Sequence, residues 1–179
     1  TQRIGALVMS GTPGGDGTKV VLDVGENTIE DMGTNKNIAN IGLHVNEIPD
    51  TTIPTLTKVM VDFTTGVIVF EASETLKLDD KNVSLFNVHL ANTTGDFRTH
   101  KNISTLTPQV TFQQRQHDAV NLEGARFVNQ NSLAITITMT ERQRVAALVL
   151  SGQSGGDRTP LVADISHGFI IDMALNRLF

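Results

Sequence analysis

The sequence contains no cysteine, no tryptophan and no tyrosine among its 179 residues. The absence of cysteine excludes disulfides, thiol catalysis and thiolate metal sites. Aromatic residues are scarce, and the eight phenylalanines are the only material for an aromatic binding platform. The sequence also opens without a methionine, a basic segment or a cleavage site. This predicts a processed or excised segment whose targeting signal, if it has one, lies outside it.

Charge is sparse as well, and no part of the chain is strongly basic. The net charge is -5, charged residues make up 18% of the chain, and no basic cluster is longer than two or three residues. This argues against a nucleic-acid surface. No apolar run approaches the roughly 20 residues that a membrane-spanning helix needs, so no membrane insertion is expected. The hydrophobic fraction of 39% predicts a packed core rather than disorder.

An internal repeat is the most informative feature that is present. Residues 2–37 and 143–178 align without a gap at an offset of 141 positions, and nearly half of the aligned pairs are identical. This offset is far longer than the roughly 20–50 residues of a solenoid repeat, so each repeat is predicted to be a domain. Residues 1–48 then form the C-terminal part of one repeat, and residues 49–54, which contain two prolines, form a linker. Residues 55–179 form a second repeat that is truncated at its C-terminal end.

Each copy contains a glycine-rich stretch, SGTPGGDGTKVVLDV from Ser10 and SGQSGGDRTPLVADI from Ser151. The glycine spacing suggests a phosphate-binding loop, in which a lysine reaches the phosphates and the following hydroxyl holds magnesium. The order here is Gly-Thr-Lys, and proline stands at the position of Lys19 in the second copy. Because the lysine is dispensable, we expect the stretch to shape the backbone. Both copies keep Gly-Gly-Asp, which supplies a positive φ and a carboxylate for a turn.

Most of the chain has the alternating or β-branched pattern of strands. Two of the predicted strands flank a hairpin turn at residues 64–66, where glycine comes last. In another, Leu133, Ile135, Ile137 and Met139 are predicted to share a buried face. The predicted strands are residues 56–63, 66–73, 83–90, 108–112, 117–122 and 132–140.

Two short segments are predicted to be helical. Thr140, followed three positions later by Gln143, has the signature of a capping box and predicts a helix that ends at Gly152. Residues 27–33 are predicted to form a single helical turn closed by glycine. Together the segments predict a mostly β fold, a sandwich of about seven strands with a helical insertion.

Three segments resemble a known family. DTTIPTLTKVMVDFTTGVIVFEASETL is similar to the opening of bacterial and algal Ig-like repeats, TMTERQRVAALVLSGQSGGDRTPLVADI to their later half, and VLDVGENTIEDMGTNKN to their ending. The resemblance covers most of the chain and implies Ig-like β-sandwich repeats in tandem, with a short helix in each repeat. Such repeats occur in large surface-layer, adhesin and algal flagellar-hair proteins, which implies an extracellular or cell-surface location. Two features depart from the family pattern: Ile53 replaces a proline, and Gly33-Thr34-Asn35 replaces the usual Gly-Asn.

Three N-glycosylation sequons lie close together, at Asn82, Asn92 and Asn102. In a secreted protein each one could carry a glycan on a solvent-facing asparagine. Asn92, in the loop-like sequence ANTTGDF, is the strongest candidate. The alternative is that a chain rich in asparagine and threonine forms sequons by chance.

Several aspartates are candidates either for calcium ligands or for turn caps. Calcium takes about six to eight oxygen ligands, which junctions between extracellular domains often supply. The candidate calcium ligands are Asp16, Asp23 and Asp50 at a domain junction, and Asp157 and Asp164 in the second copy. Aspartates that recur in both copies cap turns equally well through backbone N–H groups, and the sequence favours that interpretation.

No signature of catalysis stands out. The five histidines lack metal-ligand spacing, and Glu71 and Glu74 are better explained as surface acids at a strand end than as a catalytic pair. The sequence therefore predicts a non-enzymatic segment of an extracellular filament, hair, wall or surface layer, whose partners are neighbouring repeats and other subunits. One alternative is an adhesin-type module that recognises glycans or another cell surface. Another is an accessory domain of a wall-modifying enzyme.

Overall fold

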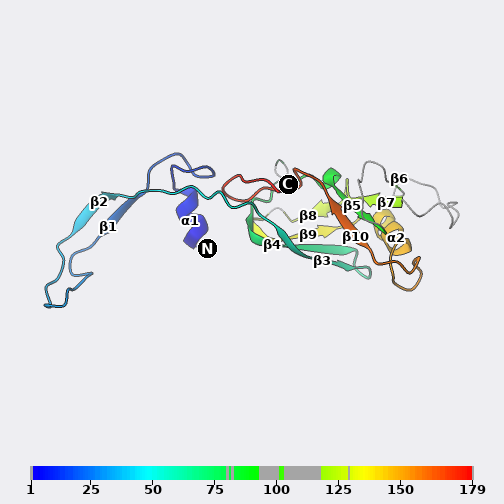
Figure 1. Cartoon of the computed structure of the whole chain (residues 1–179), viewed down its shortest axis with the longest axis horizontal. Coiled ribbons are helices and arrows are strands. Elements are labelled where there is room, and N and C mark those ends of the chain that lie inside the picture. Colours follow the sequence, from blue (N-terminus) through cyan, green and yellow to red (C-terminus); the bar gives the residue numbers. More distant parts are fainter. Residues whose placement is uncertain are drawn as a thin grey trace. The chain divides into compact units, whose positions relative to one another are not determined.

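The computed structural model describes residues 2–79, 81, 83–92, 101–102, 118–128 and 130–178 (Figure 1). The chain divides into two compact units. Unit 1 comprises Thr1–Thr52 and Met173–Leu175, and unit 2 comprises Ile53–Asp172 and Asn176–Phe179. The division after Thr52 lies inside the segment 49–54 that the sequence marks as a linker.

The described residues of unit 2 form two four-stranded sheets, of which the first is antiparallel throughout (Figure 1). The strand order in this sheet is β3-β4-β9-β8. The strands are β3 (Leu56–Asp62), β4 (Val67–Leu76), β8 (Arg126–Phe127) and β9 (Ser132–Thr138). Three of the predicted strands, at 56–63, 66–73 and 132–140, are therefore confirmed.

The second sheet of unit 2 has the order β10-β5-β7-β6. Its strands pair in antiparallel fashion except for β6 and β7, which are parallel. The strands are β5 (Val88–Ala91), β6 (Lys101–Asn102), β7 (Asp118–Asn121) and β10 (Val162–Ile165). The strand predicted at 117–122 corresponds to β7.

The core of unit 2 joins the two sheets. Side chains from both sheets, from the helix and from the segment after β10 pack into a single buried cluster. The rings of Phe70 and Phe169 meet edge to face, with their centroids 5.5 Å apart. The fully buried members include Ile68, Phe70, Ile135 and Ile137 from the first sheet, Val88, Leu90 and Val120 from the second, and Ala147 from the helix. The predicted mostly β fold is confirmed, and the arrangement is compatible with a β-sandwich.

The hairpin between β3 and β4 turns as the sequence predicts. Gly66 has a φ of +74°, which a side chain would disfavour. The Asp62 carboxylate accepts hydrogen bonds from the Thr64 amide at 2.8 Å and from the Thr65 hydroxyl at 2.7 Å. These bonds, the Thr65 hydroxyl first, lower the pKa of Asp62.

Helix α2 (Glu141–Val149) begins with the predicted capping box. The Gln143 amide donates to the Thr140 hydroxyl, and the Gln143 side-chain oxygen accepts from the Thr140 amide at 2.9 Å. The Gln143 side chain is buried, and its amide group donates to the carbonyl oxygens of Asn121 and Glu123. The cap therefore also ties the helix to the end of β7.

Three details differ from the sequence-based expectation. Only the last three residues of the strand predicted at 83–90 lie in a strand, β5, because Leu85–Asn87 form a 3-10 helix, η1. Leu133 is 56% exposed, since it lies near the start of β9, away from the centre of the sheet. Residues 27–33 form turns and a bridge between Glu30 and Lys36 instead of one helical turn. The strand predicted at 108–112 lies outside the described residues.

Unit 1 consists of helix α1 (Gln2–Val8) and a two-stranded antiparallel sheet. The strands are β1 (Val21–Val24) and β2 (Asn40–His44). In the sequence alignment α1 and β1 correspond to α2 and β10 of unit 2, so each copy of the repeat contains a short helix before this strand.

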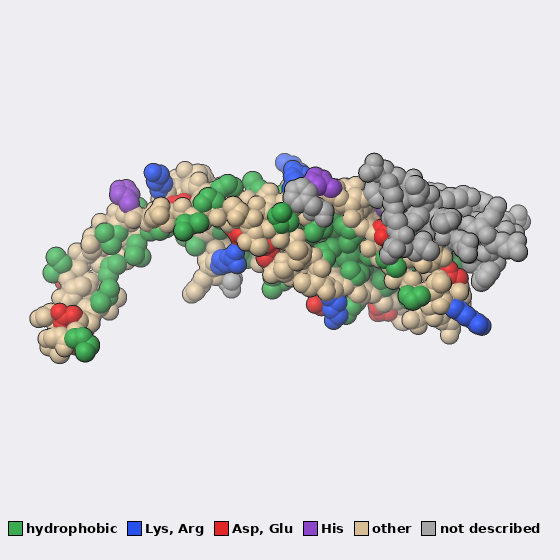
Figure 2. Space-filling view, in the orientation of Figure 1, with side chains coloured by type: hydrophobic (Ala, Val, Ile, Leu, Met, Phe, Trp, Pro, Cys, Tyr) green, Lys and Arg blue, Asp and Glu red, His purple; other side chains and the backbone are tan. Residues whose placement is uncertain are grey.

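The apolar side chains of unit 1 are far more exposed than their counterparts in unit 2. Ile29 is 60% exposed, whereas the aligned Ile170 is fully buried. Met9 is also 60% exposed, and the aligned Leu150 is fully buried. No residue of β1 or β2 is buried, and Figure 2 shows apolar side chains on the surface of this segment. The aligned apolar side chains therefore pack into a hydrophobic core in unit 2 and are largely exposed in unit 1.

This difference predicts unequal effects of one substitution at aligned positions. Ile170→Ala should lower the free energy of unfolding by about 2–5 kcal/mol, because it opens a cavity in the core. Ile29→Ala should change it by less than about 0.5 kcal/mol, because the side chain is mostly in solvent. Urea denaturation of both variants measures the two values, and equal losses would contradict the burial difference.

Candidate functional site

Residues 10–18 and 151–159 form the same structure, which we call the repeated loop. In both copies it follows the short helix and precedes a strand. The first copy has hydrogen bonds from Asp16 N to Val8 O (2.9 Å) and from Ser10 Oγ to Leu7 O (2.7 Å). The second has the aligned bonds from Asp157 N to Val149 O (2.9 Å) and from Ser151 Oγ to Leu148 O (2.7 Å). The loop conformation therefore recurs with the sequence.

Close backbone approach explains the paired glycines of the repeated loop. A Cβ atom added at Gly15 would overlap the carbonyl oxygen of Ser10, and one added at Gly156 would overlap that of Ser151. The preceding residues, Gly14 and Gly155, have φ values of +91° and +93°, in the region where only glycine is unstrained. Gly-Gly is thus required by the loop's own packing.

The amides of the repeated loop are used inside the loop, which argues against phosphate binding. Gly15 N donates to Thr12 O at 3.0 Å, and Gly17 N donates to Ser10 O at 3.1 Å. In a phosphate-binding loop these N–H groups would point at the ligand. The arrangement favours the expectation that the stretch shapes the backbone.

The recurring aspartate of the loop closes it through the threonine two residues later. The Asp16 carboxylate accepts from the Thr18 amide at 2.8 Å and from the Thr18 hydroxyl at 2.5 Å. Asp157 accepts from both groups of Thr159 in the same way. The bond from the Thr18 hydroxyl is the first cause of a lowered pKa at Asp16, followed by the bond from the Thr18 amide.

A second recurring element, which we call the repeated turn, spans residues 31–35 and 172–176. The Asp31 carboxylate accepts from the backbone and side-chain nitrogens of Asn35, and these bonds lower the pKa of Asp31. Asp172 and Asn176 form the same bonds, at 2.8 and 2.9 Å. The position before each asparagine has a positive φ, +66° in the first copy and +71° in the second.

The sequence did not predict this left-handed backbone position. It is occupied by Thr34 in one copy and Leu175 in the other, neither of which favours a positive φ. The signal that could have revealed it is the spacing Asp-x-x-x-Asn, which recurs in both copies and lets the side chains hold the turn.

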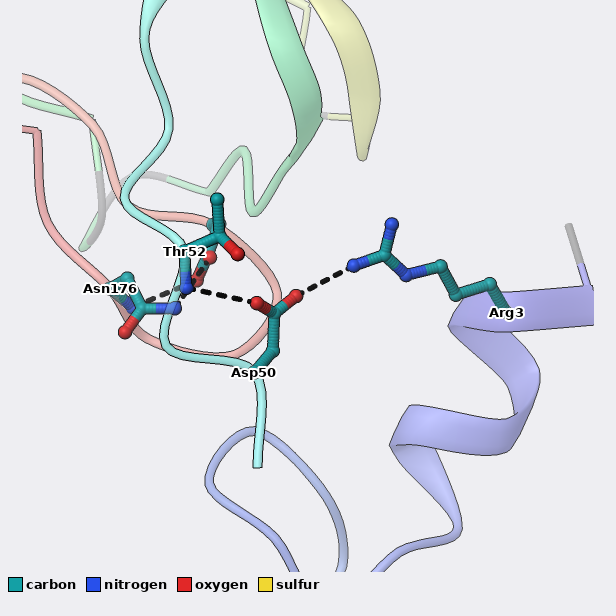
Figure 3. A network of polar contacts seen from close by, with 5 residues as sticks. Arg3, Asp50, Thr52 and Asn176 are labelled. Carbon is teal, nitrogen blue, oxygen red and sulfur yellow. Dashed lines mark hydrogen bonds and ion pairs between the residues drawn. The ribbon is translucent and has the colours of Figure 1, made fainter. Parts of the chain in front are cut away.

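The candidate calcium ligands of unit 1 serve local contacts. Asp23 accepts from the Gly42 amide at 2.7 Å. Asp50 accepts from the Thr52 amide at 3.0 Å and forms an ion pair with Arg3 at 2.8 Å (Figure 3). The Thr52 amide, and after it Arg3, lower the pKa of Asp50. Within the described residues, the carboxylates of Asp16, Asp23 and Asp50 do not come together in one group of possible metal ligands.

The two candidate calcium ligands of unit 2 lie on different elements. Asp157 belongs to the repeated loop, and Asp164 lies on β10, opposite His89 of β5. Neither joins a group of three possible metal ligands in the part of the chain that the structure describes. The contacts of Asp16 and Asp157 favour the interpretation as turn caps.

Of the three sequons, Asn92 is the one whose side chain the structure describes. Its Nδ2 atom, to which a glycan would be attached, donates to the Asp157 carboxylate at 2.8 Å, and the residue is half-buried. Asn102 lies on β6, and Asn82 lies outside the described residues. A glycan on Asn92 would therefore have to share or displace the contact with Asp157.

No family model, curated protein or solved structure matches this chain. Within the described residues, no helix is both long and apolar enough to cross a membrane.

The packing of the repeated loop predicts that its second glycine cannot be replaced. Gly156→Ala should lower the free energy of unfolding by about 1–3 kcal/mol, because the added methyl group overlaps backbone atoms. Gly152→Ala is the matched control: its Cβ would meet no atom closer than 3.4 Å, so the change should stay below about 1 kcal/mol. Urea denaturation checks both values, and a tolerated Gly156→Ala would contradict the close approach.

The contact between Asp16 and Thr18 predicts that a substitution of Thr18 changes the pKa of Asp16. Thr18→Val removes the hydroxyl and keeps the side-chain shape, so the pKa of Asp16 should rise part of the way to its ordinary value of 3.8. Because the folded-state pKa is lowered, the carboxylate stabilises the loop above the ordinary pKa and loses this effect as the pH falls through the lowered value. Carboxyl NMR titration measures the midpoint. Asp31, held by Asn35, serves as the unaffected control, and an unchanged Asp16 midpoint would contradict the assignment.

Proposed function

We propose that the chain is a structural segment of a large extracellular protein built from tandem Ig-like domains, such as a filament, flagellar hair, wall layer or surface layer. The observation that carries this proposal is the recurrence of the repeated loop and the repeated turn at an offset of 141 residues, with matching hydrogen bonds. The contacts that recur are internal to the loop and to the turn, which favours a role of both elements in the architecture of a repeated domain.

The role proposed is mechanical. Residues 49–54 connect the two copies and include Pro49 and Pro54, which restrict the local backbone. The ladder between β4 and β9 in unit 2 resists extension because its hydrogen bonds join segments far apart in the sequence. Neighbouring domains and other subunits of the assembly are the proposed partners, and no catalytic role is proposed.

Electron microscopy of the full-length native protein tests this function. A tandem array should appear as beads at a regular spacing of roughly 4 nm, the diameter expected for a compact domain of this repeat length, inside a polymer or layer. An isolated cell-surface rod with a ligand-binding tip would favour the adhesin alternative. A single globular particle would contradict both.

Glycopeptide mass spectrometry of native material tests the extracellular location. At least one of Asn82, Asn92 and Asn102 should carry a glycan if the protein passes through a eukaryotic secretory pathway. Finding all three asparagines unmodified in native material, with all of their peptides detected, would contradict the glycoprotein assignment.

A further inference from the structure

Unit 2 has a groove of about 510 Å³ that is lined by residues from both of its sheets. It lies between β3, the edge of the first sheet, and β10, the edge of the second. The apolar side chains in its lining include Val59, Val61 and Phe63 from β3 and its end, Leu90 from β5, and Leu161 and Ala163 from the β10 side. An open sheet edge beside a groove with apolar side chains in its lining is a site where a further strand can be added.

In unit 1 the strand aligned with β10 is already paired. β1 pairs with β2 in antiparallel fashion, with Leu22 opposite Leu43. Leu22 aligns with Ala163, which lines the groove of unit 2. In the described part of unit 2, β10 pairs with β5 and no strand occupies its other edge.

Residues 39–47, which we call the β2 segment, include β2 and the three residues after it. The end of this segment contacts the repeated loop in unit 1. The Glu47 carboxylate accepts from the Gly11 amide at 2.8 Å and from the Val20 amide at 2.5 Å. Gly11, Thr12 and Lys19 line a small cavity together with Val45 and Glu47. Gly11, Thr12 and Lys19 align with Gly152, Gln153 and Pro160. These aligned residues line the groove of unit 2. The surface that meets the strand in one copy is therefore part of the groove in the other.

The β2 segment has the side-chain pattern that the groove requires. Leu43 and Val45 lie on one face of the strand, because they alternate with His44 and pair with the chain from Val20 to Leu22. A bulge at Gly42 separates Ile41 from this face. In unit 1 Leu43 is 38% exposed and Val45 is 39% exposed. In unit 2 a strand in the same register would direct these two positions at the apolar side chains of the groove.

The chain path after β10 returns toward the same edge. Gly168 and Leu178 are joined by a backbone hydrogen bond, as are the aligned Asn27 and Asn37 in unit 1. Leu178 thus stands at the position of Asn37, three residues before β2 begins at Asn40. The turn that leads the chain from β1 back to β2 in unit 1 is therefore also present after β10 in unit 2.

We propose that the groove between β3 and β10 is a docking site for an antiparallel strand with the pattern of residues 39–47, supplied by the same chain after Phe179. The inference rests on the repeat relationship in the proposed function and extends it by naming the missing strand. Its apolar face fills the groove, and its terminal glutamate accepts from the amides of Gly152 and Leu161.

The experiment extends the full chain. A copy of residues 39–48 (ANIGLHVNEI) is joined directly after Phe179, and amide hydrogen exchange is followed by NMR. Because Ser166 N donates to Asn87 O on the β5 side, strand alternation places the amides of Ala163 and Ile165 on the open edge. Exchange at these two amides should slow by at least about tenfold. Unchanged exchange in the extended chain would overturn the proposal.

A matched control carries the same extension with Leu43→Asp in the added copy, which places a charge in the groove. Protection should then be lost, and equal protection would overturn the assignment of the groove. Adding the free peptide ANIGLHVNEI to the original chain tests whether the strand comes from the same chain. If the free peptide protects the two amides and the covalent extension does not, the proposal that the same chain supplies the strand is overturned. None of these outcomes depends on the bead spacing, so the strand proposal and the array proposal can fail separately.

Discussion

The close approach of a glycine to a carbonyl just beyond the end of a helix is the constraint on which the rest of this structure depends. Gly15 lies against Ser10, and Gly156 against Ser151, so closely that no side chain fits. This contact turns the chain sharply out of the helix and into the following strand. The aspartate and threonine that follow then close the loop with their own hydrogen bonds.

The same local design serves two different environments. In unit 2 the segment packs on a core that both sheets supply, and Ile170 is buried there. In unit 1 the aligned Ile29 faces solvent, although the loop beside it keeps the same hydrogen bonds. The hydrogen bonds of the repeated loop are therefore the same whether the aligned isoleucine is buried or exposed.

Much of this could be predicted from the sequence, because the relevant signals are local. The hairpin turn needs glycine at position 66, and the helix cap needs Thr140 and Gln143 at a spacing of three. The 3-10 helix at Leu85–Asn87 was missed because its apolar residues fit a strand equally well. The positive φ of Leu175 was missed because the conformation is imposed by neighbouring side chains and not by the residue itself.

The sequence by itself determined the repeated loop, the repeated turn and the copies in which they occur, since the hydrogen bonds that recur in both copies join residues close together in the sequence. Tertiary structure decided which apolar faces are covered, that Asn92 contacts Asp157, and that a groove lies between β3 and β10. These features join residues that are 65 or more positions apart or lie on different sheets. Such contacts depend on how strands pair and pack, and a local pattern does not specify that pairing.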